Sequence, residues 1–591
     1  MQDLAKQDHD EWPLRNLERI FQHGDGQDAA RRARLQALFS TGLIVAGDYS
    51  GLWGDRECLE QTKAALKMWP GWDVDMEKAI HHVRSCDKDS TCKVVLKHWA
   101  TEVDNGKSCV FDDLFDRLPP WARVWVEGAV PAADASPEVA VAAHTDIFQY
   151  LHKHRELIFP RTAVSPCLVH GKDCCVDVLS AFQEQQVREA KELTAKQARF
   201  EDVDAEVDVA DPVSRPWVIS GAGTTCVGWS PAGKQQQFAD PSEAPHAVYL
   251  VERIAKAEDE REDVFLQENS ERYRYKEKLV EPLGSTHLIL AIRWSPEDGG
   301  HPVRKPRTFA AGLNLRTTAW LGPDPDDIQE DFQRFFGRVC EANAGHFLQA
   351  GPEMVQEKRK AMAANRGHHI GDDELDNLPL DAMCARLMPP CMLMRYKKHR
   401  LARLAIGEPE PWFADLEQDF KKGASTPGSI LPSHLTHGTM WVWAGGTERP
   451  VHPLESLYGH GFLVFPSKFR CNLLDIFLQL GGRGLTRLCG NGYHLPTMAA
   501  WQLYILCHIV RLDRRAVAGP HPWLRKSSSW FVQDDVEQDD GEAAEVPEVK
   551  GEEEEQGEDE QEQEEEEEVR EEDLAQEQVN SSEEKAASDM E

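Results

Sequence analysis

A cysteine on a glycine-rich loop is the residue of this chain best placed to do chemistry. Cys226 lies within residues 221–234, directly after the apolar run 217–219, and Glu268 follows a second apolar run at 263–266. A thiol held at a strand end beside a carboxylate can act as a nucleophile whose partner handles protons. A lone cysteine after a strand is commonly a core thiol, but the neighbouring glycine, threonine and serine residues favour an exposed loop. We therefore interpret the pair as a site of covalent catalysis.

Attack on a pyrimidine ring is the reaction that suits this pair. A thiolate can add to C6 of the ring, which is otherwise too unreactive at C5 to accept a methyl group. The addition requires a proton donor at the ring nitrogen. Glu268 fits that role if burial raises its pKa.

A second group of residues has the properties of a cofactor site. The turn at 49–54 contains Tyr49, Ser50, Gly51 and Gly54, and its glycines allow close approach of a ligand to the backbone and to a helix N-terminus. A tight turn without a ligand is the alternative. Asp87 and Asp113, at the next two strand ends, suit ribose hydroxyls and an adenine amino group. The set favours a nucleoside-like cofactor, and S-adenosylmethionine is the candidate.

These residues need a sheet whose strand ends meet at one edge. The sequence predicts strands near 42–47, 83–87, 109–113, 217–219, 246–250, 263–266, 287–291 and 307–311. It predicts helices from residue 57, at 182–200, 468–480 and 497–510, with a turn at 489–492. Alternating strands, glycine turns and helices are typical of a doubly wound, Rossmann-like α/β fold.

The domain boundaries follow from changes in this pattern. We predict a helical extension at 1–37, a catalytic α/β domain at 38–315 with an insertion at 118–215, and a smaller mixed recognition lobe at 316–467. The chain then returns to the catalytic domain at 468–515. Of the net charge of −36, residues 534–591 carry −26, from 29 acidic and 3 basic residues. We therefore predict a disordered acidic tail at 532–591 that is solvated or binds basic proteins such as histones.

The order of these motifs resembles that of the DNA cytosine-5 methyltransferases. Residues 49–54 are similar to the family's Phe-x-Gly-x-Gly-Gly loop, residues 225–230 to its Pro-Cys-Gln-x-Phe-Ser loop, and residues 268–270 to its Glu-Asn-Val motif. Residues 303–307, which contain Lys305 and Arg307, occupy the place of Gln-x-Arg-x-Arg. Residues 455–462 are similar to the segment beneath the recognition region. Gly490, Asn491, Gly492 and Pro496 look like the C-terminal Gly-Asn-x-Val-Pro motif.

The resemblance implies an S-adenosylmethionine-dependent enzyme that methylates C5 of a flipped cytosine in DNA. Cys226 would attack C6, Glu268 would engage N3, and Arg307 with Lys305 would steady the base and its loop. Tyr49, Asp87, Asp113 and Asn491 would hold or frame the cofactor. A DNA substrate would imply a nuclear location. RNA is an alternative substrate, because the motifs do not separate the two polymers.

Three departures from the family pattern support a further alternative, a catalytically silent protein that binds nucleic acid or chromatin. Trp53 replaces a glycine, Thr225 replaces the proline before the nucleophile, and Lys305 replaces an arginine, with loss of the planar fork. A basic patch at 395–403 suits phosphate contacts, and its predicted nucleic-acid-binding residues are Arg395, Lys397, Lys398 and Arg400. A solvated helix face is the alternative for that patch.

The fourteen cysteines are scattered, no run approaches the length that spans a bilayer, and no leader-like start is evident. We therefore expect an intracellular protein with free thiols and no membrane partner. Cys167 follows a proline as a rival nucleophile but lacks the downstream aromatic-serine step. Cys167, His170, Cys174 and Cys175 have a spacing that could hold zinc. Adjacent cysteines rarely both ligate one ion, and no second pair follows at a familiar interval, so we assign no metal from the sequence.

Overall fold

The computed structural model describes most of the chain up to residue 512. The described residues are 2–197, 215–230, 233, 235–368, 371, 378–407, 411–418, 428–444 and 446–512. The acidic stretch at 201–211 and the predicted tail at 532–591 lie outside the described residues.

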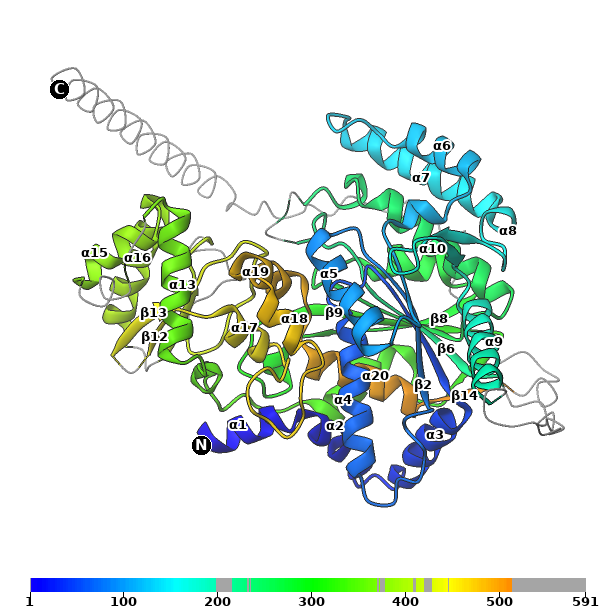
Figure 1. Ribbon diagram of the computed structural model, residues 1–591, viewed down its shortest axis with the longest axis horizontal. Coiled ribbons are helices and arrows are strands. Elements are labelled where there is room, and N and C mark those ends of the chain that lie inside the picture. The colour runs from blue at the N-terminus through cyan, green and yellow to red at the C-terminus, as the bar shows by residue number, and fades with distance from the viewer. Residues whose placement is uncertain are drawn as a thin grey trace, which may run out of the picture.

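A seven-stranded sheet forms the centre of the α/β domain (Figure 1). Its strands are β1 (Leu43–Asp48), β2 (Ile80–Cys86), β3 (Cys109–Phe111), β6 (Trp217–Gly223), β7 (Val264–Ser270), β8 (His287–Trp294) and β9 (Arg307–Asn314). They lie in the order β3-β2-β1-β6-β7-β9-β8, and β9 runs antiparallel to both of its neighbours. The other neighbouring pairs are parallel. This is the doubly wound, Rossmann-like arrangement that the sequence predicts.

The central strands are apolar on both faces because helices cover both sides of the sheet. Leu43 and Val45 of β1 join one hydrophobic cluster, whereas Ile44 and Ala46 pack into another on the opposite face. Successive side chains of a strand point to opposite faces, so a strand covered twice has no polar alternation.

Helices from distant parts of the chain form these two covers. On one face lie α2 (Trp12–Phe21), α3 (Asp28–Thr41), α4 (Gly54–Met68), α5 (Ser90–His98) and α20 (Leu495–Cys507). On the other lie α9 (Val178–Gln197), α10 (Glu243–Glu258) and α11 (Glu281–Leu283). None of the helices described here combines the length and the apolar character that a bilayer crossing requires.

The strand predicted at 246–250 is wrong, because these residues lie within α10. The helix packs between the sheet and α7 (Pro137–Lys153), and its residues from His246 to Leu250 are all buried. The apolar residues Ala244, Val248, Val251 and Ala255 recur at helical spacing, but this period shows only in a window longer than 246–250. A short apolar run of this kind is compatible with either element.

The C-terminal elements also differ from their predicted bounds. The helix predicted at 468–480 is the shorter α18 (Leu474–Gln479). The turn predicted at 489–492 is mostly the end of α19 (Gly482–Asn491). The helix predicted at 497–510 is α20, and the last residues of that range belong to β14 (Ile509–Arg511), which pairs with β10 (Thr318–Trp320).

The segment predicted as an insertion, 118–215, leaves the sheet after β3 and returns at β6. It contains α6 (Pro120–Ala129), α7, α8 (Arg155–Ile158), the hairpin of β4 (Val164–Pro166) and β5 (Asp173–Cys175), and α9. The N-terminal segment is helical. Its α1 (Gln2–Asp10), α2 and α3 end directly before β1.

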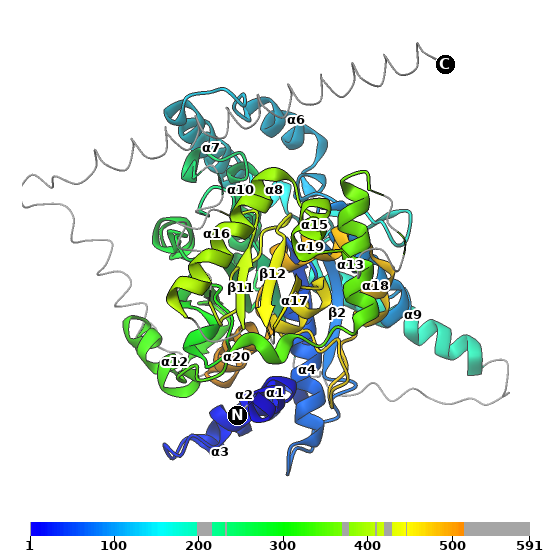
Figure 2. The same cartoon turned by 90° about the vertical axis from the view of Figure 1, so that its left-hand side faces the viewer.

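A smaller mixed lobe stands beside the sheet in Figure 1 and faces the viewer in Figure 2. It has a three-stranded antiparallel sheet of β11 (Trp412–Asp415), β12 (Met440–Ala444) and β13 (Thr447–Pro450). The helices α13 (Pro352–Asn365), α15 (Leu380–Leu387) and α16 (Pro390–Ile406) pack with it. The helix α12 (Ile328–Phe336) instead contacts β8 and α2. The helix α17 (Pro453–Gly459) follows the lobe and is tied to β13 by the ion pair of Arg449 with Glu455, at 2.8 Å.

Candidate active site

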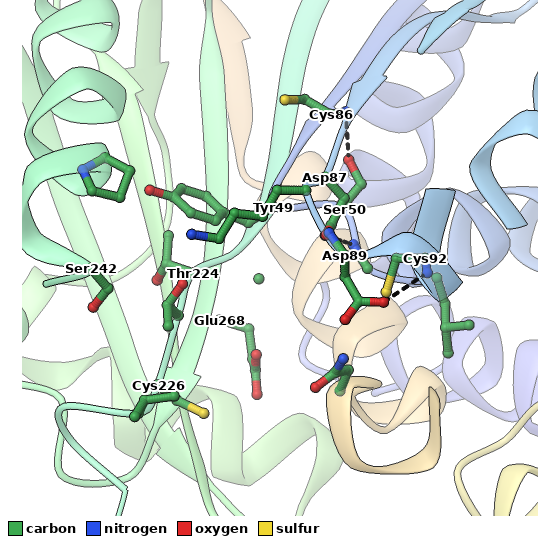
Figure 3. Close-up of a pocket in the computed structure, with 18 of the residues that line it drawn as sticks. Tyr49, Ser50, Cys86, Asp87, Asp89, Cys92, Thr224, Cys226, Ser242 and Glu268 are labelled. Atoms are coloured by element: carbon green, nitrogen blue, oxygen red, sulfur yellow. Dashed lines mark hydrogen bonds between the residues drawn. The ribbon is translucent and has the colours of Figure 1, made fainter. Parts of the chain in front are cut away.

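A cavity of about 580 Å³ opens at the carboxyl ends of the parallel strands (Figure 3). The strand order reverses between β1 and β6, and ligands of doubly wound folds bind at this crevice. Predicted site residues that line the cavity are Tyr49, Ser50, Gly51, Gly54, Asp87, Asp113, Cys226, Glu268, Arg307 and Asn491. Residues separated by more than 400 positions in the chain therefore share one cavity. Of the predicted residues that the structure describes, Lys305 and the four basic residues of α16 do not line it.

The first wall of the cavity is built by the turn after β1 and the end of β2. Gly51 donates its backbone N–H to Asp87 Oδ2 at 2.7 Å, and Asp89 donates its own to Asp87 Oδ1 at 2.8 Å. Burial raises the pKa of Asp87, against the effect of these two hydrogen bonds. Each carboxylate oxygen keeps a second lone-pair direction. Asp87 is thus fixed in place and can still accept a hydrogen bond from a ligand.

The turn at 49–54 contains two non-glycine residues in the left-handed region, Tyr49 at φ 48° and Trp53 at φ 55°. Such conformations cost about 1–3 kcal/mol and persist where the surrounding structure enforces them. The Trp53 side chain is fully buried and does not line the cavity. A Cβ atom on Gly47 would lie 2.7 Å from its indole nitrogen, so the ring occupies the space behind β1. The departure from glycine at this position therefore leaves the cavity open.

The far end of this wall is formed by Asp113, Asn491 and their neighbours. Asp113 caps the short 3-10 helix η2 (Leu114–Arg117) by accepting a hydrogen bond from Phe115 N at 3.0 Å. Asn491 ends α19, and the backbone of the following Gly492 also lines the cavity. The C-terminal motif thus returns to the cofactor side of the predicted site.

Asn269 holds the loop that carries Cys226. Its amide donates to Thr224 Oγ1 at 2.8 Å and to the carbonyl oxygens of Thr224 and Thr225 at 3.3 Å. Gln267 donates to the same hydroxyl at 2.8 Å. Gln267 and Asn269 of β7 therefore hold the loop, and Glu268, which lies between them in the strand, lines the cavity. Figure 3 shows Cys226 and Glu268 directed into the same part of the cavity.

Two groups of opposite charge, Arg307 and Glu268, act on the thiol of Cys226. Arg307 Nε lies 2.8 Å from Glu268 Oε1, and both side chains are largely buried. Burial raises the pKa of Glu268, although Arg307 and Lys305 oppose the shift. Burial also raises the pKa of the half-buried Cys226 thiol, again against Arg307. The resting site therefore favours a thiol, together with a carboxyl group that retains its proton more readily than usual.

Lys305 lies behind the wall and braces the C-terminal motif. Its ammonium donates to the carbonyl oxygen of Gly492 and, at 3.4 Å, to that of Cys489. Burial, reinforced by the nearby charge of Arg307, lowers the pKa of Lys305 to about 7. The sequence suggested contact with the base or its loop, whereas the structure places this residue under the end of α19.

The basic residues of α16 divide into two kinds. Arg395 donates to the carbonyl oxygens of Leu416 at 3.5 Å and Glu417 at 3.2 Å. Arg400 lies 3.3 Å from Asp381 and 3.5 Å from Glu448. Lys397 and Lys398 are exposed. The two arginines therefore hold the lobe together, and a phosphate-binding role remains a prediction for the two lysines.

Several cavity residues were missed from the sequence. They include Asp89, Asp240, Pro241, Ser242, Phe462 and Tyr493. Ser242 directly precedes α10. Because a strand was predicted at 246–250, the sequence did not indicate a helix N-terminus at this residue. Asp89 had a usable signal, because an acid before Ser90 and Thr91 is typical of a helix N-cap, and it does accept hydrogen bonds from Thr91 and Cys92.

No protein-family model matches the chain, and no curated protein matches it. Solved structures give distant overlays. A triple mutant of DNMT2 from Spodoptera frugiperda is 11% identical, with 79% of this chain and 99% of that chain covered and a TM-score of 0.33. Dnmt2 methyltransferase of S. pombe is 10% identical (78% and 98% covered, TM-score 0.34), and the Entamoeba histolytica methyltransferase EhMeth is 12% identical (78% and 98%, 0.33). Overlays this distant assign no activity, so function rests on the cavity itself.

Proposed function

We propose that this protein is an S-adenosylmethionine-dependent methyltransferase that acts on C5 of cytosine in DNA. One observation carries the proposal. Cys226, Glu268 and Arg307 share a single cavity with Asp87, Asp113 and Asn491, at the switch point of a doubly wound sheet. A nucleophile with a proton donor and a set of nucleoside-binding groups thus face each other.

The first wall fits the cofactor by the chemistry of its donors and acceptors. Asp87 offers free acceptor positions for ribose hydroxyls, Asp113 can accept from an adenine amino group, and Asn491 offers an amide at the same rim. The buried hydroxyl of Tyr49 has no partner within the described part of the chain. S-adenosylmethionine, when bound, supplies an electrophilic methyl group.

The second wall would prepare the base. Cys226 forms a bond to C6 as a thiolate while Glu268 gives its proton to N3, so that the added electron pair is available at C5. Arg307 remains paired with Glu268 and compensates the negative charge that the carboxylate acquires. After transfer, a water molecule takes the C5 proton, the thiolate leaves C6, and the N3 proton returns to Glu268, which together restore the neutral aromatic ring.

A covalent-adduct experiment tests the nucleophile. The native protein should form a denaturation-resistant adduct with duplex DNA containing 5-fluorocytosine in the presence of S-adenosylmethionine, and Cys226→Ala should not. Cys391→Ala, which alters an exposed thiol of the lobe, serves as the matched control and should keep the adduct. An adduct that survives Cys226→Ala would show that the mechanism is wrong.

The choice of polymer needs a separate measurement. Methyl transfer to duplex DNA should exceed transfer to folded RNA, and the reverse result would make the protein an RNA cytosine methyltransferase. Calorimetry with S-adenosylhomocysteine separates both from a silent protein. The native chain should bind it, and Asp87→Ala should weaken the affinity at least tenfold, about 1.4 kcal/mol. A DNA substrate would also make a nuclear location the expectation.

A further inference from the structure

Three thiols and an imidazole converge at the edge of the sheet, away from the proposed active site. Cys109 begins β3, and Cys167, His170 and Cys174 lie on the β4–β5 hairpin of the segment predicted as an insertion. The four ligand atoms all lie within 4.8 Å of one another. None of these residues lines the cavity described above. We call this set the thiol cluster.

The distances from His170 to the three sulfurs are those of a tetrahedral metal site. His170 Nδ1 lies 3.3 Å from the sulfur of Cys167, 3.3 Å from that of Cys174 and 3.5 Å from that of Cys109. With Zn–S near 2.3 Å and Zn–N near 2.0 Å, tetrahedral geometry places sulfur and nitrogen about 3.5 Å apart. The same geometry places two sulfurs about 3.8 Å apart. Because all four ligand atoms lie within 4.8 Å of one another, binding of an ion would shorten any pair by about 1 Å at most.

The imidazole is oriented as a metal-ligating histidine is. His170 Nε2 lies 2.9 Å from the carbonyl oxygen of Gly106, which can only accept, so this nitrogen carries the hydrogen. Nδ1 therefore presents a lone pair to the three sulfurs. Such an outer partner fixes the tautomer of a metal ligand. One lone pair accepts a single thiol hydrogen well, so hydrogen bonding alone gives no reason for three thiols to surround it.

The backbone of the hairpin turn fixes the position of Cys167. Gly171, at φ 63°, closes the turn by donating to the carbonyl oxygen of Cys167 at 3.0 Å. Cys167 donates its own backbone N–H to the carbonyl oxygen of Lys172 at 3.0 Å. These two bonds hold the cysteine beside His170 and Cys174.

The structure revises the ligand set that the sequence suggested. Cys175 points away from the thiol cluster, and its thiol contacts the carbonyl oxygens of Arg161 and Asp177 at 3.6 and 3.7 Å. Cys174 and Cys175 are neighbours on β5, so their side chains take opposite faces. The fourth ligand is Cys109, which lies 61 residues before His170 and therefore has no local spacing signal.

We propose that Cys109, Cys167, His170 and Cys174 bind one zinc ion, and that this site is structural. Three soft sulfurs and one imidazole nitrogen in tetrahedral geometry suit Zn²⁺. Four protein ligands fill the coordination shell, so no position remains for water or substrate.

The ion would fasten the hairpin to an edge strand of only three residues. Among the strands that the structure describes, β3 pairs with β2 alone, and the hairpin adds a hydrogen bond from Leu168 N to the carbonyl oxygen of Val110 at 2.8 Å. Asp112 and Asp113, which follow β3, line the cavity. The zinc ion would thus stabilise the strand end that carries one side of the proposed cofactor site.

Metal content of the full chain tests this proposal without reference to activity. The purified protein should contain one zinc per chain by elemental mass spectrometry, and Cys174→Ser should lose it. Cys175→Ser, at the adjacent residue, is the matched control and should retain one zinc. Equal zinc in the two variants, or no zinc in the native protein, would overturn the proposal, as would a disulfide between cluster cysteines in protein kept under reducing conditions.

A second variant covers the case in which loss of a ligand prevents folding. His170→Cys offers a fourth thiolate, so it should still bind one ion. In the Co²⁺-substituted form its sulfur-to-metal absorption should be stronger than that of the native protein, because four thiolates replace three. A Co²⁺ spectrum of the native protein without tetrahedral thiolate bands would contradict the assigned ligands.

Discussion

Cys226 and Glu268 share an unusual protonation problem, because burial raises the pKa of both groups. The proposed addition needs the thiolate of Cys226 and the protonated form of Glu268. Between the two pKa values, a rise in pH increases the fraction of Cys226 that is a thiolate. It decreases the fraction of Glu268 that is protonated by the same factor. The reactive form is then a small and constant fraction of the enzyme.

The first prediction follows from this balance. For the native enzyme, kcat/KM should be flat between the two pKa values and should fall below that of Glu268 and above that of Cys226. Glu268→Gln keeps an N–H donor at all pH values, so its residual activity should rise about tenfold per pH unit up to the pKa of Cys226. Initial rates from pH 5 to 10 provide the measurement.

Glu271→Gln is the control for that profile, because Glu271 is exposed and outside the cavity. Its profile should keep the plateau. If Glu268→Gln also kept the plateau, Glu268 would not be the proton donor.

Buried ion pairs connect the strands and helices beneath the cavity. Asp48, at the end of β1, forms ion pairs with Arg117 of η2, with Arg253 of α10 at 3.0 Å and with Arg84 of β2 at 3.4 Å. Glu252 of α10 lies 2.6 Å from the same Arg117. These side chains are almost completely buried. The network therefore ties η2, which follows Asp113, to the centre of the sheet.

The second prediction concerns this network. Arg117→Met should destabilise the protein by about 3–5 kcal/mol, because it leaves buried carboxylates with fewer partners. Arg123→Met removes a partly exposed arginine that pairs with Asp116 and Glu127, and it should cost less than about 1 kcal/mol. Urea denaturation of both variants measures the difference. Equal losses would mean that the buried network contributes no more than a surface pair.

The elements that the sequence predicted well are those with strong local signals. The strands from β1 to β3 and from β6 to β9 ended in recognisable turns or acids, and they positioned Asp87, Asp113, Cys226 and Glu268 correctly at one edge. The helix α10 was missed because the five apolar residues 246–250 are too few to show the helical spacing that continues to Ala255. Contacts between distant residues, such as Lys305 with Gly492, leave no local pattern at all.

At the scale of the whole molecule, the two ends of the described chain pack against each other. The helix α2 contacts both α4 and α20, and Asn16 donates to the carbonyl oxygen of Pro496 at 2.9 Å. Leu17 and Ile20 are fully buried in the same core as α20. The N-terminal helices α2 and α3 are therefore part of the α/β core.

The third prediction tests this packing. Leu17→Ala should destabilise the protein by about 2–5 kcal/mol, because it empties a packed position between α2, α4 and α20. Leu4→Ala, in the exposed part of α1, should change the stability by less than about 0.5 kcal/mol. Thermal or urea unfolding of the two variants gives the comparison. A neutral Leu17→Ala would show that the N-terminal helices are dispensable for the core.

The return of α19 and α20 to the β1 side of the cavity sets an order of events during synthesis on the ribosome. Tyr49 and Asp87 are translated long before Asn491 and Tyr493, which complete the same cavity. Every residue of α20 is buried, so its partners among α2, α3 and α4 expose apolar surface until it emerges. Partially synthesised chains that expose apolar surface are prone to aggregate. The nascent protein would therefore need chaperone protection for most of its translation, and its ligands could bind only once α19 and α20 are in place.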